Sequence, residues 1–326
     1  MHPVAPPYQL NLLLTAVAFV VAGIQLAVAP IILASQSGLS ADALAFAVLL
    51  LVPLTTPLSR ALLHEAIHSR LARRKDWNVR FGRAIAISNG VAFDAMRLGH
   101  MTHHRFPRHS LDRADIIEPG KPWVTTASKF YLGLIGWLYV REILSSMVML
   151  LPRRAIERIA DFAMANDESA MLHGALRRGL DRRIARIRLD SVLVVVVYTA
   201  AFYLYGEWWP VLLASLALRG LIVSLQDNVA HYDTPAVLGA PAHNTQAGRL
   251  ARILMLNQNL HGVHHDRPDL PWHVLPDAFR SRGEGYAGGY FTLLMRQFYG
   301  PRRADGTAIA LPVQRAPIQR TEAALN

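Results

Sequence analysis

Histidine is the residue type in this sequence whose spacing most clearly indicates chemistry. Fourteen of the 326 residues are histidine, and eight of the fourteen fall into three short clusters, 64–68 (HEAIH), 100–104 (HMTHH) and 261–265 (HGVHH). Residues at positions i, i+3 and i+4 share one face of a helix, so each cluster can direct two or three imidazoles toward one point. One copy of H-x-x-H-H is expected by chance only about 0.03 times at this histidine content, and the sequence has two.

Imidazole nitrogen is a preferred ligand of iron, zinc, copper and nickel. Eight histidines exceed what one tetrahedral zinc ion needs, and burying so many imidazoles without a metal or other partners would be costly. The clusters therefore predict a site for two metal ions. The predicted ligands are His64, His68, His100, His103, His104, His261, His264 and His265. Glu65 follows His64 directly, so we expect its side chain to face away from the metals.

Several residues outside the clusters are further candidates for the metal site. His231 follows the last long apolar segment, and we expect it to be a ninth ligand. Asn228 lies three residues earlier and can face the same point, either directly or through a water molecule. Asp227 and Asp115 are candidates for hydrogen bonds that hold a ligand imidazole in one tautomer. Asp112 is a similar candidate, although Asp112 and Asp115 could equally lie in a solvated loop.

Composition narrows the class of protein to which these histidines belong. Apolar residues make up 52% of the sequence and charged residues only 17%, with a mean hydropathy of +0.22. Soluble domains carry about 25% charged residues, so this balance argues against a disordered chain and favours a membrane protein. Cysteine is absent, which excludes disulfide frameworks, cysteine-ligated zinc and thiolate catalysis.

Four apolar segments are predicted to span a membrane, at residues 10–33, 43–63, 191–206 and 210–225. The first segment is long enough to cross a hydrocarbon core of about 30 Å. A cleaved signal peptide is the alternative for this segment, but no basic residue precedes it and it is too long. The last two segments are separated by a short turn with two tryptophans, as expected at a membrane interface.

Basic residues indicate which side of the membrane the histidines occupy. The sequence has 34 Lys and Arg residues and a formal net charge of +11, yet none precedes residue 60. They concentrate in 60–121, 153–188 and 249–320, whereas the connectors 34–42 and 205–210 carry none. This is the positive-inside pattern, and it places all three clusters on the cytoplasmic side of the cell inner membrane. Nucleic acid is a poor candidate partner because no binding motif accompanies the charge.

The remaining segments are assigned relative to these spans. Residues 130–151 are long enough to span, but a single crossing would place the basic block 153–188 outside. We therefore predict an interfacial or re-entrant segment there, followed by a cytoplasmic helical insert at 152–190. The expected architecture is an all-α integral membrane protein with a cytoplasmic histidine-rich helical cap. Residues 1–300 form a single domain, and 301–326 form a loosely ordered tail.

These motifs resemble those of the membrane fatty-acid desaturase superfamily, which includes acyl hydroxylases, alkane monooxygenases and carotenoid ketolases. The resemblance covers roughly residues 40 to 280 and rests on the three clusters, on the segment 257–265 (NQNLHGVHH) and on the following 268–276. His231 with Tyr232 is similar to the extra histidine that follows the family's fourth helix. The first cluster has the form H-x-x-x-H, which the superfamily uses beside a longer H-x-x-x-x-H form.

The resemblance implies a non-haem enzyme with two iron ions (Fe²⁺) that uses O₂ to desaturate an acyl chain. No cytochrome b5-like segment is present in the sequence, so we expect a separate electron donor such as ferredoxin with its reductase. Hydroxylation or ketolation of a lipid or carotenoid would use the same ligands and remains an alternative. A metal transporter or sensor is a more distant alternative, because none of the clusters lies within a predicted span.

Overall fold

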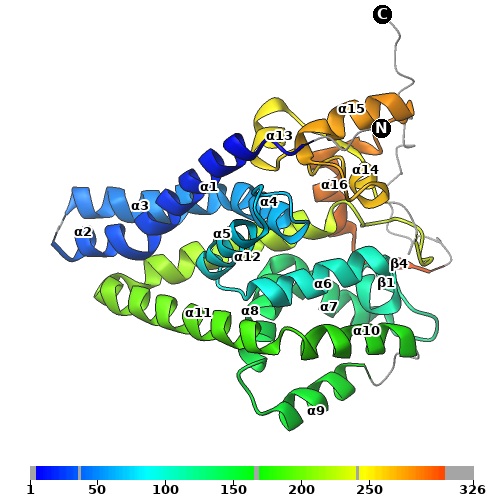
Figure 1. Ribbon diagram of the computed structural model, residues 1–326, viewed down its shortest axis with the longest axis horizontal. Helices are drawn as coiled ribbons and strands as arrows, with labels where there is room; N and C mark the ends of the chain where they lie inside the picture. Colours follow the sequence, from blue (N-terminus) through cyan, green and yellow to red (C-terminus); the bar gives the residue numbers. More distant parts are fainter. Residues whose placement is uncertain (1–4, 36–37, 165–168, 240–241, 305–326) are drawn as a thin grey trace, which may run out of the picture.

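The computed structural model describes residues 5–35, 38–164, 169–239 and 242–304, and almost all of its regular structure is helical (Figure 1). The strands are two residues long and form two parallel pairs, β1 (Ile116–Ile117) with β4 (Arg302–Arg303), and β2 (Thr245–Gln246) with β3 (Gly288–Gly289). The predicted all-α class is therefore confirmed. Most of the predicted tail, residues 305–326, lies outside the described residues.

The first apolar segment forms one long helical stretch. It consists of α1 (Tyr8–Gly23), a π-helical turn η1 (Ile24–Val28) and α2 (Ala29–Ser35), in total 28 residues, with a mean hydropathy of 2.5 over an 18-residue window. Its polar side chains Asn11 and Gln25 are fully buried, whereas its leucines and valines are largely exposed. Such a helix is long enough to cross a bilayer, with its apolar side chains toward lipid.

The second apolar segment is a bent pair of helices. α3 (Leu39–Leu54) and α4 (Thr56–Ile67) meet at an angle of 41°. Pro53 lies in the last turn of α3 and Pro57 in the first turn of α4, where a missing backbone N–H interrupts the helical ladder. The bend directs α4, which carries His64, toward the cap.

The third and fourth apolar segments form a helical hairpin. α11 (Ile184–Tyr205) and α12 (Trp209–Asn228) are joined by the 3₁₀ turn η4 (Gly206–Trp208). Gly206 has φ +50°, a left-handed conformation that favours glycine, and it allows the chain to reverse. Figure 1 shows the two helices running in opposite directions from a common end near α2.

By length and composition, two stretches among the described residues can cross a membrane, Tyr8–Ser35 and Ile184–Asn228. The bent pair of α3 and α4 makes a third if it is one span. The prediction of spanning helices is thus confirmed, while the number of four crossings remains a prediction.

The stretch predicted to be a cytoplasmic insert, 152–190, is mostly helical. It contains α9 (Arg153–Ala163) and α10 (Ala170–Asp181), and α11 begins within it at Ile184. The fully buried carboxylate of Asp190 accepts a hydrogen bond from Arg83 Nε at 2.7 Å. This pairing neutralises the charge, so α11 continues through it, and the cytoplasmic placement of the insert stays a prediction.

The segment predicted to be interfacial or re-entrant is a broken helix. α7 (Trp123–Leu132) and α8 (Leu138–Val148) flank the turn η3 (Gly133–Trp137), in which Gly136 has φ +115°. A Cβ on Gly136 would lie 3.6 Å from the backbone of Gly220, so this break is where η3 approaches α12 closely.

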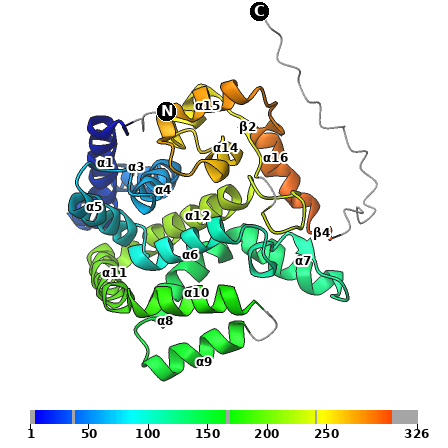
Figure 2. The ribbon, with the colours of Figure 1, turned by 45° about the vertical axis from the view of Figure 1, so that its right-hand side comes forward.

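The cap forms at one end of the spanning helices, opposite α2 (Figure 1). Figure 2 shows α14 lying across from α4 and α6, so that the three histidine clusters face one another. A core of fully buried apolar side chains, including Leu62, Ile85 and Phe93, fixes α4, α5 and α6 together. The helices and 3₁₀ turns of the cap that have not yet been given are α5 (Lys75–Ser88), α6 (Phe93–Arg105), η2 (Ser110–Asp112), α13 (Arg249–Leu254), α14 (His261–Asp266), η5 (Trp272–Val274), α15 (Leu275–Arg282), α16 (Tyr290–Arg296) and η6 (Gln297–Tyr299).

Candidate metal centre

Nine histidines from four segments of the chain converge in the cap. They come from α4 and its C-terminal end, from α6, from the turn after α12, and from α14. Within each of two groups, one ring nitrogen per residue lies within 4.8 Å of those of the other members. Group 1 contains His64, His68, His100, His104 and His264, and group 2 contains His103, His231, His261 and His265. The structure thus brings together all nine histidines that the sequence singled out.

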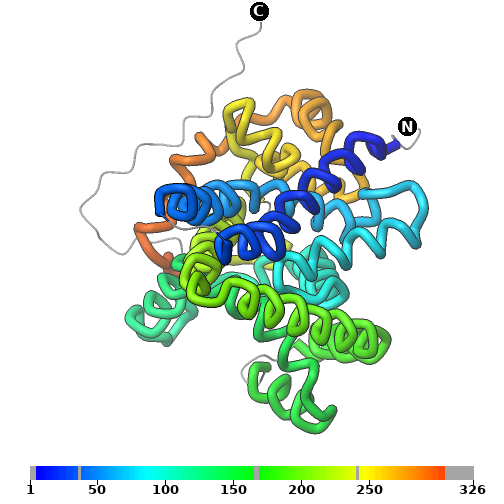
Figure 3. The backbone as a smooth tube through the Cα atoms, turned by 90° about the vertical axis from the view of Figure 1, so that its left-hand side faces the viewer, coloured from blue at the N-terminus to red at the C-terminus, as the bar shows by residue number. Residues whose placement is uncertain are grey.

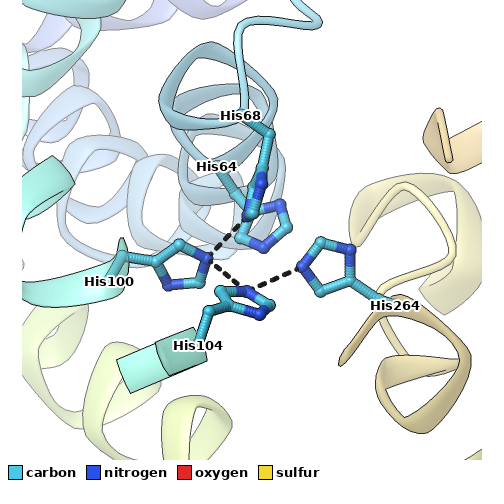
Figure 4. A group of neighbouring side chains, drawn as sticks. All are labelled: His64, His68, His100, His104 and His264. Carbon is cyan, nitrogen blue, oxygen red and sulfur yellow. Dashed lines mark hydrogen bonds between the residues drawn. The ribbon is translucent and has the colours of Figure 1, made fainter. Parts of the chain in front are cut away.

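Group 1 has its ring nitrogens aimed at a common point (Figure 4). Successive Nε2 atoms are 2.9 Å apart between His68 and His100, and 3.0 Å apart between His100 and His104. The next separation, from His104 to His264, is 3.1 Å. Two nitrogens that bind one metal at about 2.1 Å and at right angles would be about 3 Å apart, so these distances fit a metal between the rings.

Group 2 is arranged in a similar way. The Nε2 atom of His265 is 3.1 Å from those of His103 and His261. The ring of His231 completes the group, with centroid distances of 5.0 Å to His261 and 4.8 Å to His265. The two groups adjoin each other, because the rings of His104 and His265 stack with centroids 4.3 Å apart.

Unpaired nitrogens support the presence of metal ions. Both ring nitrogens of His64 and both of His231 are buried and have no hydrogen-bond partner among the described residues. A buried polar atom without a partner costs about 1–3 kcal/mol. One such histidine lies in each group, and a metal bound there would satisfy the orphaned nitrogen. The donor set therefore fits two imidazole-ligated ions.

Burial keeps most of these rings in the neutral form that binds metals. It lowers the pKa of His100, His231 and His264 well below the ordinary value, with neighbouring histidines adding to the effect. It also lowers the pKa of His261 to about 3 and that of His104 to about 2. These rings are therefore uncharged and ready for a cation at neutral pH.

His103 is the exception, because a carboxylate supports it. Its Nδ1 lies 2.8 Å from both carboxylate oxygens of Asp112. Burial alone would lower the pKa of His103, but the hydrogen bond and charge of Asp112 outweigh burial and raise that pKa. The same contact fixes the ring so that Nε2 faces the group. The hydrogen bond considered for Asp112 from the sequence is thus present.

Asp115 pairs with an arginine in the loop after α6. Its two carboxylate oxygens accept hydrogen bonds from Arg108 at 2.7 and 3.1 Å, and both side chains are fully buried. The backbone N–H of Asp233 donates to the same carboxylate at 3.1 Å. Asp115 therefore stabilises the loop after α6 against the turn after α12. Within the described ranges, no hydrogen bond joins it to one of the nine rings, so its support of the metal site stays a prediction.

A cavity of about 540 Å³ lies beside the histidines. Asp227 and Asn228 line it, and Asn228 donates from Nδ2 to Gln297 Oε1 at 3.1 Å. Hydrogen bonds between one of the nine rings and Asp227 or Asn228 are not found in the described part of the chain, so their supporting role remains a prediction. The histidines that line the cavity are His64, His100, His103, His231 and His261. Its other walls include the apolar Leu63, Ile67, Met96, Leu138, Val223, Met255 and Tyr290 and the paired Arg60 and Glu142.

A clamp between distant segments was not predicted from the sequence. Trp272 donates from Nε1 to Asn11 Oδ1 at 2.9 Å. Asn11 also donates to the backbone carbonyls of Arg70, at 3.0 Å, and Leu71, at 3.3 Å. The first spanning helix is thereby tied to the chain just after the first and third clusters. The sequence contained only one indication of this contact, which is the polar residue Asn11 inside an apolar segment.

A comparison with known protein families matches residues 41–296 to the family described as Fatty acid desaturase. Since the match covers most of the chain and includes all nine histidines, the protein belongs to the fatty acid desaturase family. This confirms the resemblance inferred from the motifs. Membership indicates an oxidoreductase that acts in a membrane context on a lipid or acyl substrate. Among curated proteins, none matches the sequence of this chain.

Proposed function

We propose that the protein is an O₂-dependent di-iron desaturase that introduces a double bond into an acyl chain. The observation that carries the proposal is the division of nine histidines into two adjoining groups, within a chain of the fatty acid desaturase family. Group 1 would hold one ferrous ion with five imidazoles, and group 2 the other with four. When bound, the iron pair would supply the redox chemistry that activates O₂ and removes hydrogen from an unactivated C–H bond.

The chain's own residues position the reactants. Apolar side chains of the cavity, such as Leu63, Leu138 and Val223, would hold two neighbouring methylene groups of the substrate beside the rings. The same side chains exclude water from the reacting carbons. Asp227 lies on the cavity wall, where we propose that it supports group 2 by a hydrogen bond, directly or through water. Removal of one hydrogen from each carbon, with O₂ and two further electrons and protons, gives the alkene and two waters.

We also propose four membrane crossings in the cell inner membrane, by α1–α2, α3–α4, α11 and α12. The reversal at Gly206 supports separate crossings for α11 and α12, because a straight 45-residue helix would far exceed the thickness of a bilayer. The absence of Lys and Arg from 205–210 and 34–42 supports a cytoplasmic cap. The broken helix α7–α8 would then lie at the interface or re-enter the membrane.

Electrons would come from a separate acidic protein, such as a ferredoxin with its reductase. The net charge of +11 supports this assignment, because complementary charge speeds the encounter of partners. The same charge would also attract anionic lipid. The electron donor is therefore supported less directly than the di-iron site.

The test combines metal analysis with product analysis. Purified protein should contain two iron ions per chain, and cells that express it should accumulate acyl chains that have lost two hydrogens. A product that gains oxygen instead would identify the hydroxylase or ketolase alternative. Metal uptake into vesicles without oxygen consumption would overturn the proposal in favour of a transporter. The matched control is the protein with His264→Ala and His265→Ala, which removes one ligand from each group.

A further inference from the structure

Two short helices of the cap have apolar side chains on their outer faces. On α13, Leu250 is 71% exposed and Ile253 is 50% exposed. On α16, Phe291 is 66% exposed and Met295 is 59% exposed. Single exposed apolar residues are normal at a surface, but here each of two short helices that pack on one buried cluster exposes two large apolar side chains at helical spacing. We call these four residues the outer patch.

The inner face of α16 is buried, and α13 packs against the same cluster. Tyr290 and Leu293 of α16 are buried in one cluster with Val229 and with Met255, which follows α13, and Ala251 of α13 lies partly buried against it. Met255 and Tyr290 also line the cavity beside the histidines. Each helix therefore has apolar side chains on two sides, one toward the cavity and one away from the protein. A helix in this position separates the cavity from whatever covers the outer patch.

Basic side chains accompany the outer patch. Arg249 and Arg252 on α13 are exposed, and Arg296 on α16 is partly exposed. Among the described residues, none of these three guanidinium groups forms an ion pair. Some exposed arginines elsewhere pair with acids, as Arg153 does with Glu157 and Asp181, whereas others, such as Arg73 and Arg105, form no ion pair among the described residues. Unpaired arginines beside exposed apolar residues are the composition of a helix that lies on an anionic membrane surface.

The position of the two helices agrees with this composition. α13 packs against α4, the helix that continues the bent spanning pair into the cap. Figure 3 looks at the molecule from the end where α2 lies, and it shows the yellow segment with α13 and the orange segment with α16 at the edge of the helix bundle. α4 continues from α3, whose side chains Phe46, Leu51 and Leu54 are exposed, so α13 packs where the bent pair of helices enters the cap.

We propose that α13 and α16 dock on the cytoplasmic leaflet of the bilayer. The outer patch lies among the outer acyl carbons, while Arg249, Arg252 and Arg296 bind lipid phosphate groups. Because Met255 and Tyr290 form the cavity wall on the same elements, only one layer of protein then separates the cavity from lipid. An acyl substrate dissolved in the leaflet would reach the cavity past these helices. The proposal needs the membrane location but not the metal chemistry, so it is tested independently of turnover.

The absence of cysteine from the sequence makes a direct test possible. Leu250→Cys and Phe291→Cys would each receive a nitroxide spin label in the full chain, reconstituted in nanodiscs of phosphatidylcholine and phosphatidylglycerol. The control is Val237→Cys, another exposed position, on the loop whose Ala236 carbonyl accepts a hydrogen bond from Arg113 near β1. This loop lies at the end of the molecule far from α2 (Figure 1).

The readout is the collision rate of each label with oxygen, which concentrates in lipid, and with a water-soluble nickel chelate. Docking predicts that oxygen accessibility exceeds chelate accessibility several-fold at positions 250 and 291, with the reverse at 237. Higher chelate accessibility at 250 and 291 would show that the patch faces water and would overturn the proposal. Low accessibility to both reagents would show that protein covers the patch, and it would overturn the proposal as well.

A second measurement tests the arginines without relying on a label. The protein with Arg249→Gln, Arg252→Gln and Arg296→Gln should retain several-fold less phosphatidylglycerol through purification than the unchanged protein. The matched control is Arg153→Gln with Arg177→Gln, which removes exposed arginines that already pair with carboxylates. Both variants should bind the same amount of metal as the unchanged protein. Equal retention of phosphatidylglycerol in all three proteins would contradict the assignment of phosphate binding.

Discussion

The two histidine groups differ in how they are built, although they adjoin each other. Group 1 has five members, all from the three sequence clusters, whereas group 2 has four and includes His231 from outside them. Three of the four members of group 2 line the cavity, namely His103, His231 and His261, but only two of the five in group 1 do so. Metal sites that bind a reacting molecule keep a coordination position open, whereas structural sites are closed by protein ligands. The comparison indicates that group 2 is the more open position.

The largest expected effect is the loss of a ligand from either group. His264→Ala removes a nitrogen from group 1 and His265→Ala removes one from group 2, so each variant should bind about one metal ion instead of two and form no product. Metal content per chain and product yield from the same preparation provide the measurement. If either variant retained both ions and full activity, that histidine would not be a ligand.

A smaller and more selective effect is expected for Asp112→Asn. This change removes the charge that holds the ring of His103, and loss of such a support typically lowers metal affinity about 10–100-fold. The weakening should be confined to group 2, so titration with a chelator should release one ion early and the other at the unchanged concentration. Early release of both ions, or of neither, would show that Asp112 does not distinguish the groups.

The clamp of Asn11 allows the opposite selectivity to be tested. Asn11→Ala leaves the indole N–H of Trp272 and the carbonyls of Arg70 and Leu71 without their partner, which should lower stability by about 1–3 kcal/mol. Because Arg70 and Leu71 follow His68, metal release should shift mainly in group 1, by less than the shift from Asp112→Asn.

The matched control for this variant lies on the same helix. Thr15 is buried and donates only to the carbonyl of Asn11 within α1, so Thr15→Ala should leave the metal content unchanged. Melting temperature in detergent and chelator titration measure the two effects. A larger change in group 2 than in group 1 would contradict the role assigned to Asn11.

The smallest effect is expected for His173→Ala. His173 lies on α10, outside both groups, so this variant should keep both ions and its activity. Metal content and product yield measured beside the variants of His264 and His265 make it a control for histidine loss as such. A loss of metal here would show that the site extends beyond the nine rings.

Local spacing was sufficient to predict the histidines that converge, but it could not predict their supports. The three clusters and His231 follow from helical periodicity and from their position after apolar segments, and the structure brings all nine rings together. The clamp of Asn11 on Trp272 joins residues 261 positions apart, and the Arg83–Asp190 pair joins residues 107 apart. Such contacts depend on how helices pack, so spacing along the sequence could not reveal that Arg108 pairs with Asp115 or that α11 begins at Ile184.

The order of the histidines along the chain has a consequence for biosynthesis. Ribosomal synthesis delivers His64, His68, His100 and His104 early, so a nascent chain holds four of the five nitrogens of group 1 but only His103 of group 2. The remaining nitrogens arrive after the α11–α12 hairpin, and the clamp on Asn11 closes only when Trp272 has emerged. If the groups bind metal as proposed, group 1 would be nearly complete well before group 2, and a prematurely terminated product would trap at most one ion.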